Sequence, residues 1–203
     1  MTTWQERWGA VMMDNYGTPP IMLVRGQGSR VWDDRGTEYI DLIAGIAVNA
    51  VGHAHPDITA AITRQLETLG HTSNLYATPR GISLAEKLLD IAAVPSGSRV
   101  FFCNSGAEAN EAAFKLSRLD GRTDVIVAKG SFHGRTMGAL ALTAQPAKAD
   151  PFRPLPGDVI VVPFGDTEAL TAAVSSRTAA VFLEPIQGEG GVIVPPDRKS
   201  TRL

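Results

Sequence analysis

Residues 125–136 read Val-Ile-Val-Ala-Lys-Gly-Ser-Phe-His-Gly-Arg-Thr, an apolar run followed by a polar, glycine-containing stretch and then by a helical pattern. The apolar run is short, rich in β-branched residues and not alternating, which is typical of a strand covered on both faces. Outward from this stretch, the same succession of strand and helix recurs from residue 99 to residue 183. Strands that alternate with helices need crossover connections, so this part of the chain predicts a largely parallel α/β sheet.

The elements of this expected sheet follow one another closely. The strands are short apolar runs, and the helices have apolar residues at three- and four-residue spacing. Strands are predicted at 99–103, 125–128, 159–162 and 179–183, and helices at 107–119, 136–143 and 167–174. The last strand has the apolar character of an interior strand, so we expect a further element beside it.

The chain before residue 99 has a different pattern. Trp4, Trp8 and Met12 recur at helical spacing and predict a short amphipathic helix at the start of the chain. Short segments with turn residues between them then predict a small antiparallel sheet, with strands at 21–24, 30–33 and 38–42 and a turn at 34–36.

Two amphipathic helices are expected between the small sheet and residue 99. A loop rich in glycine and alanine at 44–55 leads to Pro56, which occupies a first helical position, and Gly70 closes this helix. A second helix follows Pro79. The apolar face of the first helix comprises Ile58, Ile62, Leu66 and Leu69, and the inward residues of the second are Ile82, Ala85, Leu88 and Leu89.

The composition is that of an ordinary folded protein. Of the 203 residues, 44% are hydrophobic and 20% are charged, which excludes the disordered, collagen-like and coiled-coil classes. The net charge of −2 gives no field that would gather nucleic acid or an anionic membrane surface, so neither is an expected partner. The sequence has neither a signal-peptide pattern nor an apolar run of membrane-spanning length, and we expect a cytoplasmic protein.

The cysteine and histidine content favours neither a disulfide nor a metal. Cys103 is the one cysteine and has no partner within the chain, which indicates a reducing compartment. His53 and His55 have a spacing that occurs in metal sites, but no third ligand lies near them in the sequence. We therefore interpret both histidines as loop residues and expect no metal.

The strongest local signal is at 102–110, Phe-Cys-Asn-Ser-Gly-Ala-Glu-Ala-Asn, where an expected strand passes through a glycine-containing turn into a helix. Backbone N–H groups at a helix start have no acceptor within the helix, and with the helix dipole they form a phosphate-sized anion site. The alternative is a helix cap without a ligand, formed by Asn104 or Ser105. The turn matches neither the common dinucleotide pattern nor the P-loop pattern.

Two further loops follow expected strands, at the edge where open α/β sheets bind ligands. In the loop at 131–136, Arg135 could bind a carboxylate and Phe132 could cover a flat ring. The alternative is a buried Phe132 with a solvated Arg135. The loop at 184–191 combines Glu184 and Glu189 with three glycines, which indicates either close approach to a ligand or a flexible surface loop.

Taken in this order, the segments resemble the class III, fold type I pyridoxal-phosphate (PLP) aminotransferases, and among these the acetylornithine aminotransferases. The resemblance extends to about residue 196 and rests on segments 15–20, 52–56, 71–76, 104–110, 132–136 and 184–191. It implies a fold type I architecture, in which an N-terminal helix and a small antiparallel sheet precede part of a largely parallel α/β sheet domain. It also implies that full-length relatives are homodimers with PLP at the subunit interface.

The resemblance assigns roles to individual residues. The turn at 105–107 matches the one whose backbone holds the PLP phosphate, and Phe132 matches the aromatic residue against the pyridine ring. The residues that it places next to PLP are Ser105, Gly106, Ala107, Phe132, His133 and Glu184. Of the substrate-binding residues, Arg135 matches the arginine that takes the α-carboxylate, and Glu189 matches a glutamate that engages another arginine. Tyr76 completes the implied substrate set.

The implied reaction moves the terminal amino group of N-acetylornithine to 2-oxoglutarate, forming glutamate, in arginine biosynthesis. This chemistry needs a Schiff-base lysine and an aspartate at the pyridine nitrogen. No segment matches the family's aspartate, and none of the five lysines matches its lysine motif: Lys87, Lys115, Lys129, Lys148 and Lys199. We therefore expect the chain to correspond to the first part of an aminotransferase and to be inactive alone, with no catalytic lysine.

The expected domains are an N-terminal arm with the small sheet over 1–55, the first part of the PLP-binding domain over 56–196, and an unmatched tail over 197–203. One alternative is a non-catalytic module that docks on a full-length aminotransferase subunit through its leading arm. Another is a nucleotide-binding α/β protein, which the absence of both phosphate-loop patterns disfavours. Open apolar faces and an open sheet edge also predict aggregation unless a partner covers them.

Overall fold

Strand β4 (Asp124–Ala128) is the centre of a parallel sheet in the computed structural model, which describes residues 2–195. It pairs in parallel with β5 (Asp158–Val162) on one side and with β6 (Thr178–Phe182) on the other. All five residues of β4 are buried. The predicted parallel sheet and the predicted positions of these three strands are therefore confirmed.

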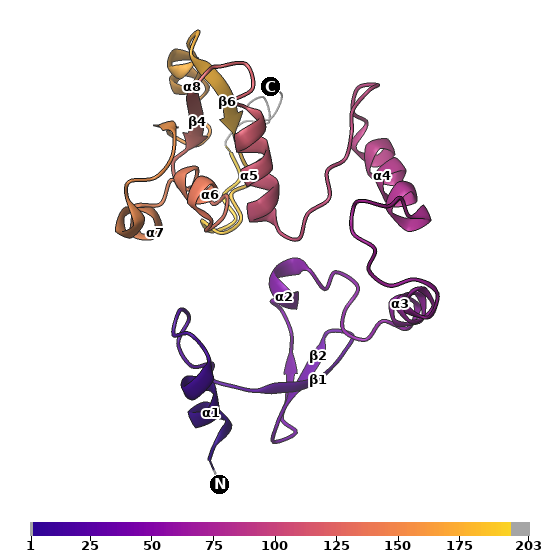
Figure 1. The fold of residues 1–203 in the computed structure, drawn as a ribbon. Coiled ribbons are helices and arrows are strands. Elements are labelled where there is room, and N and C mark those ends of the chain that lie inside the picture. The colour runs from indigo at the N-terminus through magenta and orange to yellow at the C-terminus, as the bar shows by residue number, and fades with distance from the viewer. Residues whose placement is uncertain (1, 196–203) are drawn as a thin grey trace. The chain divides into compact units, whose positions relative to one another are not determined.

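Helices cover this sheet where their apolar residues meet the strands. Phe114 on α5 (Gly106–Leu116) packs with Val125 and Val127 of β4 and with Leu142, which follows α6 (Met137–Ala141). Figure 1 shows α5 and α6 side by side next to the strands. The remaining helices of this part are α7 (Pro146–Ala149), the 3₁₀ turn η1 (Asp150–Phe152) and α8 (Thr167–Ala173).

The second sheet is small and antiparallel, as predicted. Its strands are β1 (Leu23–Gln27), β2 (Arg30–Asp33) and β3 (Glu38–Ile40), in that order. Asp33 fixes the turn between β2 and β3, because its carboxylate accepts hydrogen bonds from the N–H groups of Arg35 and Thr37 and from the Tyr39 hydroxyl. Burial raises the pKa of Asp33, but these hydrogen bonds together hold the pKa below its usual value.

The longer helices of the first hundred residues lie where the sequence predicts them. Helix α1 (Trp4–Val11) starts at a Thr3 cap that exchanges hydrogen bonds with Glu6. Helix α3 (Pro56–Thr68) and helix α4 (Pro79–Ala92) both begin at a proline. The predicted loop at 44–55 contains one helical turn, α2 (Ala44–Ala47), in which Gly45 and Ile46 have positive φ.

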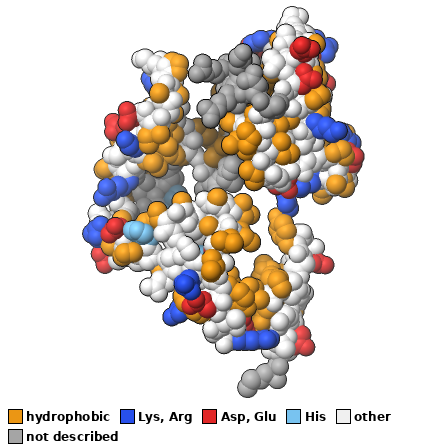
Figure 2. Space-filling view, turned by 180° about the vertical axis from the view of Figure 1, so that it is seen from behind, with side chains coloured by type: hydrophobic (Ala, Val, Ile, Leu, Met, Phe, Trp, Pro, Cys, Tyr) orange, Lys and Arg blue, Asp and Glu red, His pale blue; other side chains and the backbone are white. Residues whose placement is uncertain are grey.

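The predicted inward face of α4 is wrong, because Ile82 is 52% exposed and Leu88 is 41% exposed. Among the described residues, neither α3 nor α4 contains a buried residue. Leu66 and Ile62 of α3 are likewise more than half exposed. Figure 2 shows apolar side chains gathered at the surface of the molecule. Both helices have amphipathic sequences, and within residues 2–195 their apolar faces are not buried.

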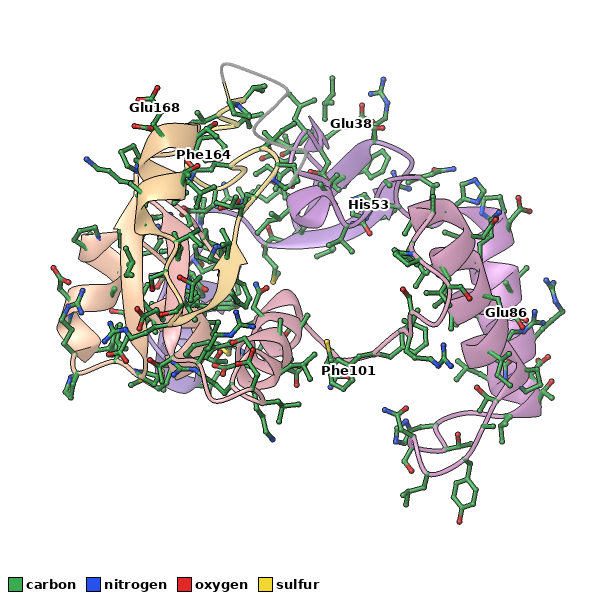
Figure 3. All side chains as sticks on the ribbon, turned by 90° about the horizontal axis from the view of Figure 1, so that it is seen from above. Glu38, His53, Glu86, Phe101, Phe164 and Glu168 are labelled. Atoms are coloured by element: carbon green, nitrogen blue, oxygen red, sulfur yellow. The ribbon has the colours of Figure 1, made fainter. Side chains whose placement is uncertain are left out.

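The predicted strand at 99–103 is also wrong. In the described part of the chain this segment pairs with no strand, and Phe101 is 66% exposed. Figure 3 shows Phe101 on a stretch of chain that is neither helix nor strand. The reason is that an apolar extended segment becomes a strand only when a neighbour pairs with its backbone. In the described residues the sheet consists of β5, β4 and β6, and the segment at 99–103 pairs with none of them.

The chain forms two compact units, residues 1–81 and residues 82–203. The predicted domain division at 55/56 stays a prediction, and the predicted tail at 197–203 lies outside the described residues. Over residues 2–195, no helix combines the length and apolar character needed to cross a membrane.

Candidate active site

The start of helix α5 is capped and still offers free backbone donors. The Ser105 hydroxyl accepts from the Glu108 N–H at 3.2 Å, and the Glu108 carboxylate accepts from the Asn104 N–H at 2.7 Å. The predicted helix cap is therefore present at Ser105. The N–H groups of Gly106 and Ala107 have no acceptor among the described residues, and a side chain built on Gly106 would meet nothing within 4 Å. An anion can approach this helix start from open space.

The loop after β4 lies against this helix start. Gly134 has φ +138°, and a Cβ added to it would lie 2.8 Å from the Cβ atoms of Ala107 and Ala139. Only glycine fits this position, because both the backbone conformation and the space exclude a side chain. The Asn110 side-chain amide donates to the His133 carbonyl at 2.6 Å, and Thr143 accepts from the His133 N–H at 3.0 Å. Segments 105–107 and 132–135 are thus brought together as one surface.

Glu184 joins the loop after β6 to the loop after β4. One carboxylate oxygen accepts from the Phe132 N–H at 2.9 Å, and the other accepts from the Gly188 N–H at 3.2 Å. The side chain of Gln187 is buried and donates to the Lys129 carbonyl at 2.9 Å. The start of the loop at 184–191 is therefore tied to the end of β4 by hydrogen bonds, whereas residues 188–191 are exposed.

Glu189 lies in a polar cluster beside Phe132. Its carboxylate accepts from Lys148 Nζ at 2.6 Å and from Gln145 Nε2 at 2.7 Å. These hydrogen bonds, and the charges of Lys148 and Arg135, lower the pKa of Glu189. The Arg135 guanidinium lies 5.9 Å from the centroid of the Phe132 ring. The Phe132 ring, the cations of Lys148 and Arg135, and the Glu189 carboxylate are therefore neighbours.

His133 is a buried imidazole with one unsatisfied nitrogen. It is 7% exposed, and its ring meets the Phe182 ring edge to face at 6.0 Å. Burial lowers the pKa of His133, and the nearby Glu184 charge opposes this shift. In the described residues no partner reaches His133 Nε2. The loop at 131–136 therefore contains a buried neutral histidine with one unsatisfied nitrogen.

Several residues that hold the site together were not identified from the sequence. Glu111 on α5 accepts from the N–H groups of Gly138 and Ala139, at 2.8 and 3.0 Å, and so caps α6. Glu111 belongs to no local motif, because its hydrogen-bond partner Gly138 lies 27 positions away in the sequence. The glycines at 130, 134 and 138 were the available signal, since a side chain on Gly130 would press on Gln187 and one on Gly138 would press on Glu111.

Three further residues singled out in the sequence are described within their own units. Tyr76 belongs to the unit of residues 1–81 and is 71% exposed. His53 Nε2 is 2.8 Å from an Asp41 carboxylate oxygen, and the His53 backbone pairs with Gly28, so this histidine has a structural partner (Figure 3). Cys103, at the end of the predicted strand at 99–103, is exposed. No group of three potential metal ligands occurs within residues 2–195.

The cluster in the second unit combines chemically distinct groups. The α5 start presents N–H donors, Phe132 presents an aromatic face, and Arg135 and Glu189 carry opposite charges. Such a set suits a flat phosphorylated ring together with a small zwitterionic molecule. The roles of these side chains toward ligands stay predictions.

The class-III aminotransferase family model matches residues 11–203. The acetylornithine aminotransferase of Mycobacterium tuberculosis is 65% identical over 194 residues, which cover 96% of this chain and 48% of that protein. The acetylornithine aminotransferase of Streptomyces clavuligerus is 60% identical over 94% of this chain and 47% of its own length. The chain therefore spans about half the length of the curated relatives that it matches.

Solved structures give the same assignment of fold. The ornithine aminotransferase of Toxoplasma gondii has a TM-score of 0.88 at 30% identity. The match covers 100% of this chain and 50% of that chain. The N-acetylornithine aminotransferase of Stenotrophomonas maltophilia has a TM-score of 0.73 at 40% identity, over 93% of this chain and 48% of its own. The predicted fold class, the PLP-transferase type I fold, is confirmed.

Proposed function

The chain belongs to the class III aminotransferases, and on this premise we propose that the protein is a PLP-dependent transaminase acting on N-acetylornithine and 2-oxoglutarate. Arginine biosynthesis is the process that this reaction serves. Relatives with the name acetylornithine aminotransferase are 57–65% identical to the chain, which supports the choice of N-acetylornithine as amino donor.

The observation that carries this proposal is the assembly of three loops into one surface. Gly134 packs on Ala107 at the α5 start, and Glu184 binds the Phe132 backbone. Backbone N–H groups that suit a phosphate, an aromatic face, Arg135 and Glu189 then belong to one surface, although residues 105 and 189 are 84 positions apart in the sequence.

The residues present fit PLP. The open N–H groups of Gly106 and Ala107 suit its phosphate, and the face of Phe132, which is only partly buried, suits its ring. His133, whose buried Nε2 has no partner among the described residues, remains a proposed cofactor-binding residue. When bound, PLP supplies an electron-accepting ring and an aldehyde carbon through which an amino group passes between two substrates.

The chain's own side chains would orient the substrates. Arg135 would bind the α-carboxylate through two parallel N–H donors, which fixes the direction of the amino acid. Glu184 keeps Phe132 in place through the backbone, so its role is to position the aromatic face. Glu189, whose pKa is lowered by the hydrogen bonds from Lys148 and Gln145, would engage a further arginine, as the resemblance implies. Tyr76 remains a proposed substrate residue of the other unit.

The experiment is a transaminase assay of the protein at its full natural length with PLP. We expect glutamate to form from N-acetylornithine and 2-oxoglutarate with a higher kcat/KM than from ornithine or 4-aminobutyrate. The variant Arg135→Lys is expected to lose about tenfold in kcat/KM, since a point charge replaces a bidentate donor. If glutamate forms with ornithine as amino donor but not with N-acetylornithine, the proposed substrate is contradicted.

We also propose that the 203-residue chain alone forms no glutamate, because none of its lysines follows the family's Schiff-base motif. Borohydride reduction with PLP, followed by mass spectrometry, tests this directly. We expect no stoichiometric adduct, and a single modified lysine would contradict the proposal. A cytoplasmic, homodimeric state of the full-length protein is part of the same proposal, and sedimentation analysis checks the dimer.

A further inference from the structure

Residues 42–52 form a loop whose two ends are anchored on the hairpin turn between β1 and β2. At one end, the Asp41 N–H donates to the Ser29 carbonyl at 2.9 Å. At the other end, His53 and Gly28 exchange two backbone hydrogen bonds of 2.8 and 2.9 Å. Figure 3 shows His53 beside the small sheet. The loop therefore leaves the small sheet and returns to it at one place.

The turn inside this loop has a backbone conformation that L-residues rarely adopt. Ala44, Gly45, Ile46 and Ala47 all have positive φ, from +49° to +64°. In this region the Cβ of a non-glycine residue approaches the following carbonyl oxygen, and a β-branched residue such as Ile46 is an outlier. The Ile46 side chain is 87% exposed, so within residues 2–195 its own packing does not offset this strain. The turn therefore needs support from outside residues 44–47.

The Asp41 carboxylate provides this support. One of its oxygens accepts from the N–H groups of Ile43 at 3.0 Å and Ala44 at 2.8 Å, where the turn begins. The other oxygen lies 2.8 Å from His53 Nε2. The side chains of His53 and Asp41 are 28% and 16% exposed, so the pair is less screened than one on the open surface. The hydrogen bonds from His53 and Ala44 hold the pKa of Asp41 below its usual value.

We propose that Asp41 and His53 form a latch on a conformational switch. While the pair is intact, it holds the turn at 44–47 in its left-handed conformation, and when the pair opens, the turn relaxes to negative φ. The latch thereby controls how Ile43 and Ile46, which are 71% and 87% exposed, are presented at the surface. This inference goes beyond the proposed function and does not depend on it, because all these contacts lie within residues 1–81.

A latch that opposes backbone strain has a signature that an ordinary stabilising contact lacks. Glycine adopts positive φ without a steric cost, so Ile46→Gly makes the latch unnecessary. Val48→Gly does not, because Val48 has a φ of −75°, where glycine only adds freedom to the backbone. Ile46 and Val48 are both β-branched and 87% and 80% exposed, which makes Val48→Gly the matched control. An ordinary contact predicts that both substitutions loosen the loop.

The test is hydrogen exchange with mass spectrometry on the protein at its full natural length, with rates corrected for the intrinsic exchange of each sequence. We expect His53→Ala to speed exchange of residues 42–52 about tenfold, the scale of a lost hydrogen bond to a charged group, and to leave β4 unchanged. The double variant with Ile46→Gly should exchange as slowly as the unchanged protein. The double variant with Val48→Gly should exchange at least as fast as His53→Ala.

Two results would overturn the proposal: unchanged exchange of residues 42–52 in His53→Ala, or equal exchange in the two double variants. If His53→Ala does not fold, the yield of folded protein becomes the readout. Ile46→Gly must then restore folding and Val48→Gly must not, and restoration by both or by neither would contradict the latch.

Discussion

Residues 105–193 and residues 44–103 are equally regular in sequence and differ in how their apolar side chains are used. In the first region, β4 is completely buried, and hydrogen bonds join loops far apart in the chain. In the second, α3 and α4 have no buried residue among those described, and the extended stretch at 99–103 has no strand partner. The comparison shows that a periodic pattern is enough to form a helix, whereas burial requires a second surface.

The same comparison distinguishes site residues that are fixed by hydrogen bonds to other elements from site residues that have few such contacts. Phe132, Glu184 and Glu189 are fixed by contacts to other elements of their own unit. Tyr76 lies in a segment at 71–78 with few hydrogen bonds and is 71% exposed. We therefore expect the region around β4 to carry the chain's cooperative stability.

The largest expected effect contrasts a core leucine with an exposed one. Leu142 is 0% exposed in the core cluster, whereas Leu66 on α3 is 67% exposed. Leu142→Ala should lower the free energy of unfolding by about 3 kcal/mol through loss of buried contacts and a cavity. Leu66→Ala should change it by less than about 0.5 kcal/mol. Urea unfolding followed by circular dichroism measures both, and similar losses would break the comparison by showing that the α3 face is covered.

The next effect concerns the contact between two loops of the site. Gly134→Ala must place a Cβ against Ala107 and Ala139, whereas Gly121→Ala, also at positive φ, meets nothing within 4 Å. Both changes strain the backbone at positive φ, and the extra loss in Gly134→Ala reflects the added Cβ contacts together with its larger φ of +138° against +83°. Gly134→Ala should lose about 1–3 kcal/mol more, the range for overpacking. Equal losses of unfolding free energy would show that the loop does not press on the α5 start.

A smaller and pH-dependent effect is expected at Glu111. Burial raises the pKa of Glu111, but the hydrogen bonds from Thr136, Ala139 and Gly138 bring the pKa below its usual value. Its stabilisation is therefore complete above the unfolded-state pKa and is lost as pH falls through the lower native pKa. Glu111→Gln should cost about 1 kcal/mol at pH 7.

The measurement for Glu111 is the melting temperature of both proteins between pH 7 and pH 3. The difference between them should shrink as pH falls below about 4.5, the ordinary value for a glutamate. A difference that stays constant over this range would contradict a role for the Glu111 charge in capping α6.

The smallest effect is expected at His133. Because burial lowers its native pKa, the unfolded chain binds a proton more readily, and stability falls as pH drops below about 6.5. His133→Gln should remove up to about 1 kcal/mol of this dependence between pH 7 and pH 5. Urea titrations at the two pH values provide the comparison, and an unchanged pH dependence in the variant would refute a buried neutral histidine.

Sequence reasoning located the helices and most strands because their signals are local. Prolines mark the starts of α3 and α4, Ser105 caps α5, and the apolar run at 125–128 forms β4. The reasoning failed at 99–103 because strand pairing depends on a neighbour that no local pattern specifies.

The loops of the candidate site could be predicted from local signals, but the residues that support these loops could not. Its loops carry recognisable residues at strand ends, and these residues lie together. The supporting residues Glu111, Gln145 and Lys148 act across 27 to 44 positions of sequence, so only the folded arrangement identifies them. Glycine spacing at 130, 134 and 138 was the one local indication of close packing there.

The central claim is that the α5 start, Phe132 and the loop at 184–191 form a single cofactor and substrate site. A crystal structure of the protein at its full natural length, grown with PLP and glutarate, tests this most directly. The account predicts phosphate oxygens within about 3.2 Å of the Gly106 and Ala107 nitrogens, with the pyridine ring on the face of Phe132. A PLP molecule bound elsewhere, with Phe132 covered by other side chains, would contradict it.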